Sequence, residues 1–154
     1  MISETQIRSV ALFFFYAFME ESVATAAINK SLRKIEKSMR KESEFSSFQA
    51  ATVYWTERVW RRYKKRAKYI NLGLDRMFNL PRDIDLEAWR QLQKEVLPEE
   101  YLSVIWSSLL EFSHLEIAEG LGVSAGTVQH RTGIALKKLG LILNSGKPNG
   151  KKRA

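Results

Sequence analysis

The chain has 154 residues, enough for one ordinary domain or two small helical ones, and its apolar fraction of 45% excludes an intrinsically disordered protein. Its formal net charge of +8 favours polyanionic partners such as nucleic acid or an anionic membrane surface. The absence of cysteine excludes a disulfide framework, a thiolate metal site and a cysteine nucleophile.

The first predicted element is a helix that begins near residue 4 and contains the apolar run Val10 to Met19. Ser3-Glu4-Thr5-Gln6 has the pattern of a capping box ahead of this run. Ala24-Thr25-Ala26 imitates a signal-peptidase site, but Glu20 and Glu21 precede it and the helical pattern continues past it. The run is also shorter than the roughly 20 residues of a membrane-spanning helix. We therefore expect a buried core helix, with no membrane insertion.

Two further helices are predicted, from about Glu21 to Glu42 and from about Phe45 to Tyr69. Apolar residues recur in each at helical spacing and form a core stripe. The stripe of the first consists of Ala24, Ile28, Leu32, Ile35 and Met39, and that of the second of Phe48, Thr52, Trp55 and Val59. Other faces carry the lysines Lys30, Lys34, Lys37 and Lys41, and the set Tyr54, Arg58, Arg61 and Lys65.

Residues 72–86 lack a clear period and contain Gly73 and Pro81, which indicates a linker. A helix is predicted from Asp85 to Val96, and Pro98 suits the first position of the next, where Glu99 and Glu100 complement the helix dipole. The pattern predicts an all-α fold of two small helical domains, residues 1–71 and 87–143, joined by a linker at 72–86. The basic tail 144–154 is expected to be disordered.

The strongest motif runs from Ser113 to Val128 and predicts a helix-turn-helix. Ser113 and Glu116 form a capping box, Gly122 supplies the positive φ of the tight turn, and Ser124 caps the second helix. Small or apolar residues would close the core between and behind the two helices: Ile117, Ala118, Leu121, Val123, Val128, Thr132, Ala135 and Leu139.

The N-terminal end of the second helix is the part that enters a major groove in this motif. Its candidate DNA-binding residues are Ser124, Ala125, Gly126, Thr127, Gln129, His130 and Arg131. Gln129 can pair with adenine, and Arg131 with guanine or with phosphate. The alternative is a small helical hairpin with a polar face. With two histidines and no cysteine in the chain, no metal site is expected.

The segment from Leu97-Pro98-Glu99-Glu100 through Ser113–Val128 to Ala135-Leu136-Lys137-Lys138-Leu139 resembles the fourth conserved region of sigma-70-family initiation factors, especially the extracytoplasmic-function group. The resemblance implies that this domain reads the −35 promoter element. It also implies that the candidate residues of the second helix face DNA.

The first domain resembles the second region of the same family in outline. Glu20 to Lys30 falls where the family has an acidic helix that contacts polymerase, which implies polymerase contacts at Ala24, Ala27, Ile28, Lys30 and Ser31. Phe48 to Arg66 falls where aromatic and basic residues hold the −10 strand, which implies DNA contacts at Tyr54, Arg58, Arg61, Arg62 and Lys65. The sequence departs from the pattern after Val23, where Ala24 to Ala27 replace the usual acidic residues.

These features predict a cytoplasmic, sigma-like transcription initiation factor that binds core RNA polymerase and promoter DNA. An anti-sigma factor or a second sigma subunit is a further expected partner. No cofactor is expected, and no phosphate loop, metal-spaced motif or nucleophile elbow supports an enzyme. The alternatives are a DNA-binding regulator that does not melt promoters, and an RNA-binding or interaction protein. In the third helix, the aromatic residues could serve packing, and the basic run could be a solvated face.

Overall fold

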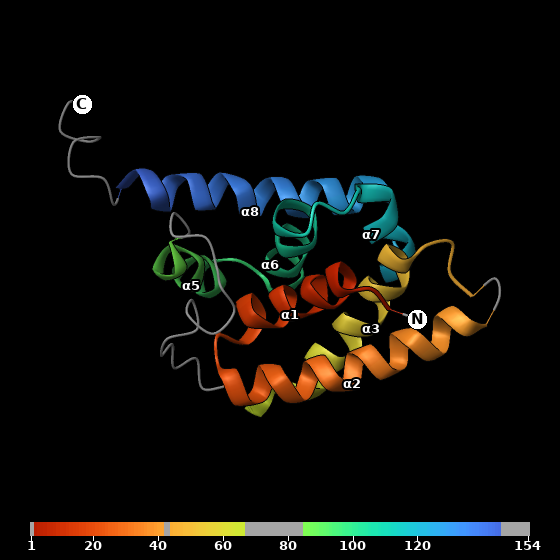
Figure 1. Ribbon diagram of the computed structural model, residues 1–154. Coiled ribbons are helices and arrows are strands. Elements are labelled where there is room, and N and C mark those ends of the chain that lie inside the picture. The colour runs from red at the N-terminus through yellow and green to blue at the C-terminus, as the bar shows by residue number, and fades with distance from the viewer. Residues whose placement is uncertain (1, 42–43, 67–84, 146–154) are drawn as a thin grey trace.

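The computed structural model describes residues 2–41, 44–66 and 85–145, and within these ranges the chain is all-α, as predicted. Figure 1 shows the helix α8 along one side of the molecule and α2 along the opposite side, with α1, α3 and α6 between them. No helix in the described ranges is both long and apolar enough to cross a membrane.

The first helix, α1 (Glu4–Phe18), begins at the predicted capping box. The backbone N–H of Gln6 donates to the Ser3 hydroxyl at 3.2 Å, and the Ser3 N–H donates to the Gln6 side chain at 3.0 Å. The helix ends at Met19, whose φ of 52° is left-handed. The apolar run is buried in the core except at Ala11 and Leu12, which are half-buried, and this confirms the predicted core helix.

The next two helices are α2 (Glu21–Arg40) and α3 (Phe48–Tyr63), and a 3₁₀ turn, η1 (Lys64–Arg66), extends α3. Ser47 caps α3 by accepting a hydrogen bond from the N–H of Ala50 at 3.1 Å. The predicted stripe is buried at Ala24, Ile28 and Ile35. The stripe is wrong at Met39, which is 44% exposed, because in the last turn of α2 the side chain that faces α3 is Ser38.

Three short elements follow, α5 (Leu86–Glu95), α6 (Pro98–Val104) and the π turn η2 (Ile105–Leu109). Asp85 caps α5 through the N–H of Ala88 at 3.1 Å, and Pro98 occupies the first turn of α6, as predicted. The π turn is not predictable from apolar spacing. Most of the predicted linker, 72–86, lies outside the described residues.

The last two helices are α7 (His114–Leu121) and α8 (Ala125–Ser145). The stripe Val128, Thr132, Ala135 and Leu139 of α8 is buried, as predicted. The helix runs two residues past the predicted end at 143. The rest of the predicted tail, 146–154, lies outside the described residues.

The N-terminal half (α1–α3) and the C-terminal half (α5–α8) share one hydrophobic core. The ring of Phe13 stacks on that of Trp106 with centroids 5.3 Å apart, and the indole N–H of Trp106 donates to the Thr56 hydroxyl at 3.1 Å. The Tyr101 hydroxyl donates to the carbonyl oxygen of Tyr16 at 2.7 Å. The two helical units are therefore packed against each other.

Candidate nucleic-acid interface

Local hydrogen bonds fix the turn between α7 and α8. The Ser113 hydroxyl accepts from the N–H of Glu116 at 3.1 Å, and the Glu116 carboxylate accepts from the N–H of Ser113 at 2.9 Å. Gly122 has a φ of 71° and donates its N–H to the carbonyl of Ala118 at 2.8 Å. Ser124 then accepts from the N–H of Thr127 at 3.0 Å. The predicted capping box, positive φ and second cap are all confirmed.

The candidate residues of α8 divide into two sets by exposure. Ser124, Gly126, Gln129 and His130 are exposed, whereas Ala125, Thr127 and Arg131 are half-buried. Ser124 and Thr127 also bond to each other through their hydroxyls at 2.9 Å, so both have a structural role in starting the helix. The free polar groups at this end are therefore those of Gln129 and His130.

Arg131 lies apart from that outer set. It lines a groove of about 710 Å³ between the helix-turn-helix and α3. Arg58, Arg61 and Lys64 line the same groove from the side of α3 and η1. The structure thus turns one predicted DNA-reading side chain toward the other half of the molecule.

A second groove, of about 460 Å³, lies between α2 and α3 and combines cations with aromatic rings. The Arg58 guanidinium lies over the ring of Tyr54 at 4.1 Å, and the Lys34 ammonium lies 5.4 Å from the ring centroid of Trp55. We call this the α2–α3 basic groove; its lining residues are Lys30, Lys34, Tyr54, Trp55, Arg58, Val59, Arg61 and Arg62. It brings together four of the five predicted DNA contacts of the first half, Tyr54, Arg58, Arg61 and Arg62, but not Lys65.

The aromatic residues of α3 differ in accessibility. Trp60 is only 8% exposed and serves packing, whereas Tyr54, Trp55 and Tyr63 are half-buried. The indole N–H of Trp55 donates to the Ser38 hydroxyl at 2.7 Å, which fixes its ring beside α2. Tyr54 and Trp55 are therefore the partly exposed rings that line the α2–α3 basic groove.

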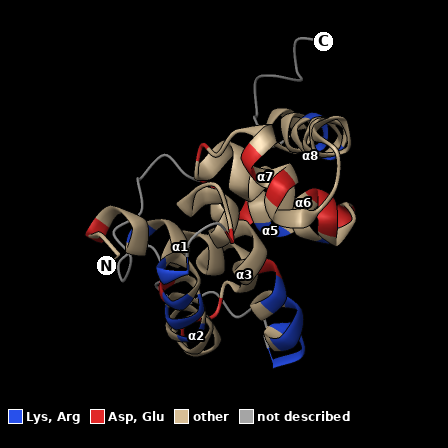
Figure 2. Cartoon of the chain, turned by 90° about the vertical axis from the view of Figure 1, so that its right-hand side faces the viewer, with Lys and Arg blue, Asp and Glu red and all other residues tan. Residues whose placement is uncertain are grey.

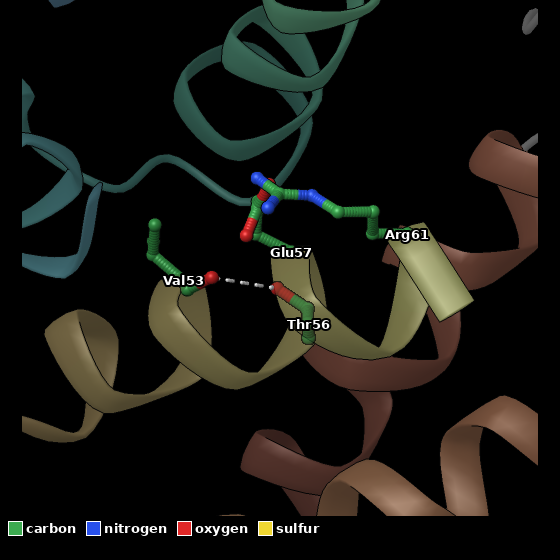
Figure 3. Close-up of polar contacts among 4 residues, drawn as sticks. All are labelled: Val53, Thr56, Glu57 and Arg61. Atoms are coloured by element: carbon green, nitrogen blue, oxygen red, sulfur yellow. Dashed lines mark hydrogen bonds and ion pairs between the residues drawn. The ribbon is translucent and has the colours of Figure 1, made fainter. Parts of the chain in front are cut away.

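An ion pair within α3 partly neutralises the positive charge that Arg61 presents to a ligand. Figure 3 shows Arg61 folded back toward Glu57, one turn earlier on α3, with which it forms an ion pair. Thr56, drawn beside them, is buried and donates to the carbonyl oxygens of Thr52 at 2.6 Å and Val53 at 3.4 Å. Arg62 is exposed and forms no ion pair with any described residue, so it is the less committed cation of the two.

The charges are segregated in space. Figure 2 shows Lys and Arg on α2 and at the end of α3, and Asp and Glu on α6 and α7. The acidic stretch of the sequence between Asp83 and Glu119 has nine acidic residues against two basic ones, Arg90 and Lys94. After Glu119 the sequence contains no Asp or Glu and seven Lys or Arg. Among the described residues, the positive potential therefore gathers on the α2–α3 basic groove and at the end of α3.

The five predicted polymerase contacts do not form one surface. Ala24, Ala27, Ile28 and Ser31 are buried in the core, on the face of α2 turned toward α1 and α3. Lys30 is half-buried and lines the α2–α3 basic groove instead. In this conformation it is the one member of the set whose side chain a partner can reach.

Sequence reasoning left two features of the site without a role. Lys34 belongs to the α2–α3 basic groove, and its spacing of four residues from Lys30 on one helix was the available signal. The sequence suggests no role for Gly120. In the structure it is buried against α3, where an added Cβ would lie 2.6 Å from the carbonyl oxygen of Ala50. No local signal could have identified it, because the contact joins segments about 70 residues apart.

Comparison with known proteins identifies a similar fold but no relative by sequence. No protein-family model and no curated protein matches the chain. Its structure is similar to that of the sigma factor RpoE from Bartonella quintana, solved in complex with the anti-sigma factor NepR, with a TM-score of 0.68. The similarity covers 92% of this chain and 94% of that one at 14% sequence identity. At this identity it shows that the two chains share a fold.

Proposed function

We propose that this protein is a sigma-like transcription factor that recognises promoter duplex DNA through α7 and α8 and binds core RNA polymerase. The observation that carries the proposal is the capped helix-turn-helix, with Gln129 and His130 exposed at the start of α8, on a fold similar to that of a sigma factor. A helix N-terminus that exposes amide and imidazole groups is suited to reading base edges in a major groove.

The charge distribution supports the same assignment. The recognition helix α8 contains no Asp or Glu and carries Arg131, Lys137 and Lys138, of which Lys138 pairs with Glu95 at 3.6 Å, so its own charge favours phosphates. On the other half, the α2–α3 basic groove offers Tyr54 and Trp55 for base stacking and Arg58 and Arg62 for phosphates. Stacking combined with phosphate pairing suits a single strand, so we assign this groove to melted promoter DNA.

The proposed partners follow from the same function. A factor that acts on promoters in a bacterium meets core RNA polymerase in the cytoplasm, so we place the protein there. The similar fold was solved with an anti-sigma factor bound, and we include a protein of that kind among the proposed partners. A second sigma subunit is the other candidate.

A second function is favoured by one observation, the burial of Ala24, Ala27, Ile28 and Ser31. Without an accessible polymerase-contacting surface at these positions, the chain would bind promoters as a regulator and would not initiate transcription. The fold and the helix-turn-helix are the same under both functions. They differ only in what the N-terminal half does.

Run-off transcription with reconstituted core RNA polymerase on a genomic promoter library tests the proposal. We expect transcripts that depend on this protein from a subset of promoters, and Gln129→Ala should change which promoters are used. Gln91→Ala is the matched control, because Gln91 is also an exposed glutamine but lies on α5, outside the recognition helix. Sequence-specific binding without transcripts would select the regulator. Failure of the protein to select any duplex would refute both functions.

A further inference from the structure

The helix-turn-helix is held against the N-terminal half at unusually short range. Gly120 of α7 packs on α3, and a Cβ built at this glycine would lie 2.6 Å from both the carbonyl oxygen of Ala50 and the Cβ of Val53. Side-chain carbons do not come this close to backbone oxygens, and the Ala50 oxygen belongs to a helix and cannot rotate away. A larger residue at position 120 would therefore push α7 away from α3.

The neighbouring residue, Glu119, adds polar bonds at the same place. Its carboxylate accepts a hydrogen bond from the backbone N–H of Ser46 at 2.9 Å and a second from the Ser46 hydroxyl. The hydroxyl bond, and then the backbone bond, lower the pKa of Glu119, so the charged form is the one that joins the halves. We call the set Ser46, Ala50, Val53, Glu119 and Gly120 the α3–α7 contact.

The α3–α7 contact determines what Arg131 can reach. The groove beside it, lined by Arg131 on one wall and by Arg58, Arg61 and Lys64 on the other, has the volume of a small-ligand pocket, about 710 Å³. A DNA duplex presents a major groove about 12 Å wide and must surround the recognition helix to be read. Such a body does not fit between α8 and α3. Gln129 and His130 are exposed outside this groove and need no such space.

We infer that the α3–α7 contact withholds Arg131 from DNA, and that separating α7 from α3 adds this residue to the set that reads the promoter. In the closed form, duplex DNA meets the outer residues Gly126, Gln129 and His130. In the opened form it also meets Arg131. This inference rests on the proposed function, since it requires that α8 bind duplex DNA.

The opening is measurable without DNA. Because the chain contains no cysteine, Arg33→Cys on α2 and Leu115→Cys on α7, both at exposed positions, give a clean pair for spin-label distance measurements. Gly120→Ala should add a population with a longer distance. Gly140→Ala is the matched control, since a Cβ there meets nothing within 4 Å, and it should leave the distribution unchanged. Ser46→Ala should shift the distance distribution in the same direction as Gly120→Ala. It replaces Gly120→Ala in the test if that variant does not fold.

The consequence for DNA is tested by combining substitutions in unlabelled protein, with a duplex selected by the wild-type chain as the probe. Arg131→Ala should weaken binding less than about twofold in the wild-type background and roughly tenfold in the Gly120→Ala or Ser46→Ala background, the loss expected for one good base contact. Equal losses in closed and opened backgrounds would refute the inference and leave the proposed function standing. Spin-label distances that stay unchanged in both Gly120→Ala and Ser46→Ala would also refute the inference and leave the proposed function standing. If no variant binds any duplex, the proposed function fails, and the role of Arg131 fails with it.

Discussion

Glu119 is a surface carboxylate that joins parts of the chain far apart in sequence. Its two bonds to Ser46 are made in the folded chain and lower its pKa below the usual value of 4.5. A carboxylate whose pKa is lower in the folded state stabilises that state while it is charged. This stabilisation is fully present above the ordinary pKa and is lost as the pH falls through the lower, folded value.

We therefore predict that the free energy of unfolding decreases as the pH falls below about 4.5, and that Ser46→Ala removes part of this dependence. Thermal denaturation of both proteins from neutral pH downward measures the difference. Ser108→Ala, at an exposed position outside the α3–α7 contact, should keep the wild-type profile. Parallel curves for wild type and Ser46→Ala would show that the hydroxyl bond contributes nothing to this pH dependence.

The helix-turn-helix is the element that the sequence specifies most fully. Ser113, Gly122 and Ser124 act on backbone groups within a few residues of themselves, so their roles follow from local chemistry. The start of α1 at Ser3 was predictable for the same reason. Each cap determines its geometry without help from the rest of the chain.

Other elements depend on contacts that no local pattern encodes. The π turn η2 places Trp106 in the core against Phe13 and Thr56, both far away in sequence. Met39 continues the apolar spacing of α2 but is exposed, because Ser38, and not Met39, faces Trp55 of α3 in the last turn of that helix. The burial of Ser31 and the position of Arg131 likewise depend on which faces meet. The sequence therefore predicted the helices and the turn better than it predicted which side chains a ligand can reach.

Substitution of two glycines of the helix-turn-helix, Gly122 in its turn and Gly140 in α8, should have opposite effects on stability. Gly122→Ala places a side chain at a φ of 71°, which should cost about 1–2 kcal/mol of stability although the space around it is open. Gly140→Ala, inside α8 and also in open space, should stabilise the protein by up to about 1 kcal/mol. Urea denaturation measures both. A neutral Gly122→Ala would mean that the turn relaxes to another conformation.

At the scale of the whole molecule, the shared core couples the two halves. Tyr101 bonds to the backbone of α1, and the side-chain amide of Gln93 donates to the carbonyl of Ala17 at 2.9 Å. Trp106 contacts both α1 and α3. Opening the molecule completely would expose these groups, so the closed form should dominate in the free chain.

This coupling predicts one cooperative unfolding transition. Two tryptophans, Trp55 and Trp60, lie in the N-terminal half, and the other two, Trp89 and Trp106, lie in the C-terminal half. Tryptophan fluorescence and far-ultraviolet circular dichroism should therefore give coincident urea curves. Single-tryptophan variants that retain Trp55 or Trp89 extend the test to each half. Separate midpoints for these two variants would show that the halves fold independently.

The fit of Gly120 against Val53 has a consequence for protein engineering. A helix-turn-helix from another protein, substituted here, would need glycine at this position whatever residues it exposes at the start of its second helix. A donor motif with alanine there would require a smaller residue at 53, and the carbonyl of Ala50 would still obstruct it. The face of α7 that packs against α3 thus determines which motifs can be exchanged.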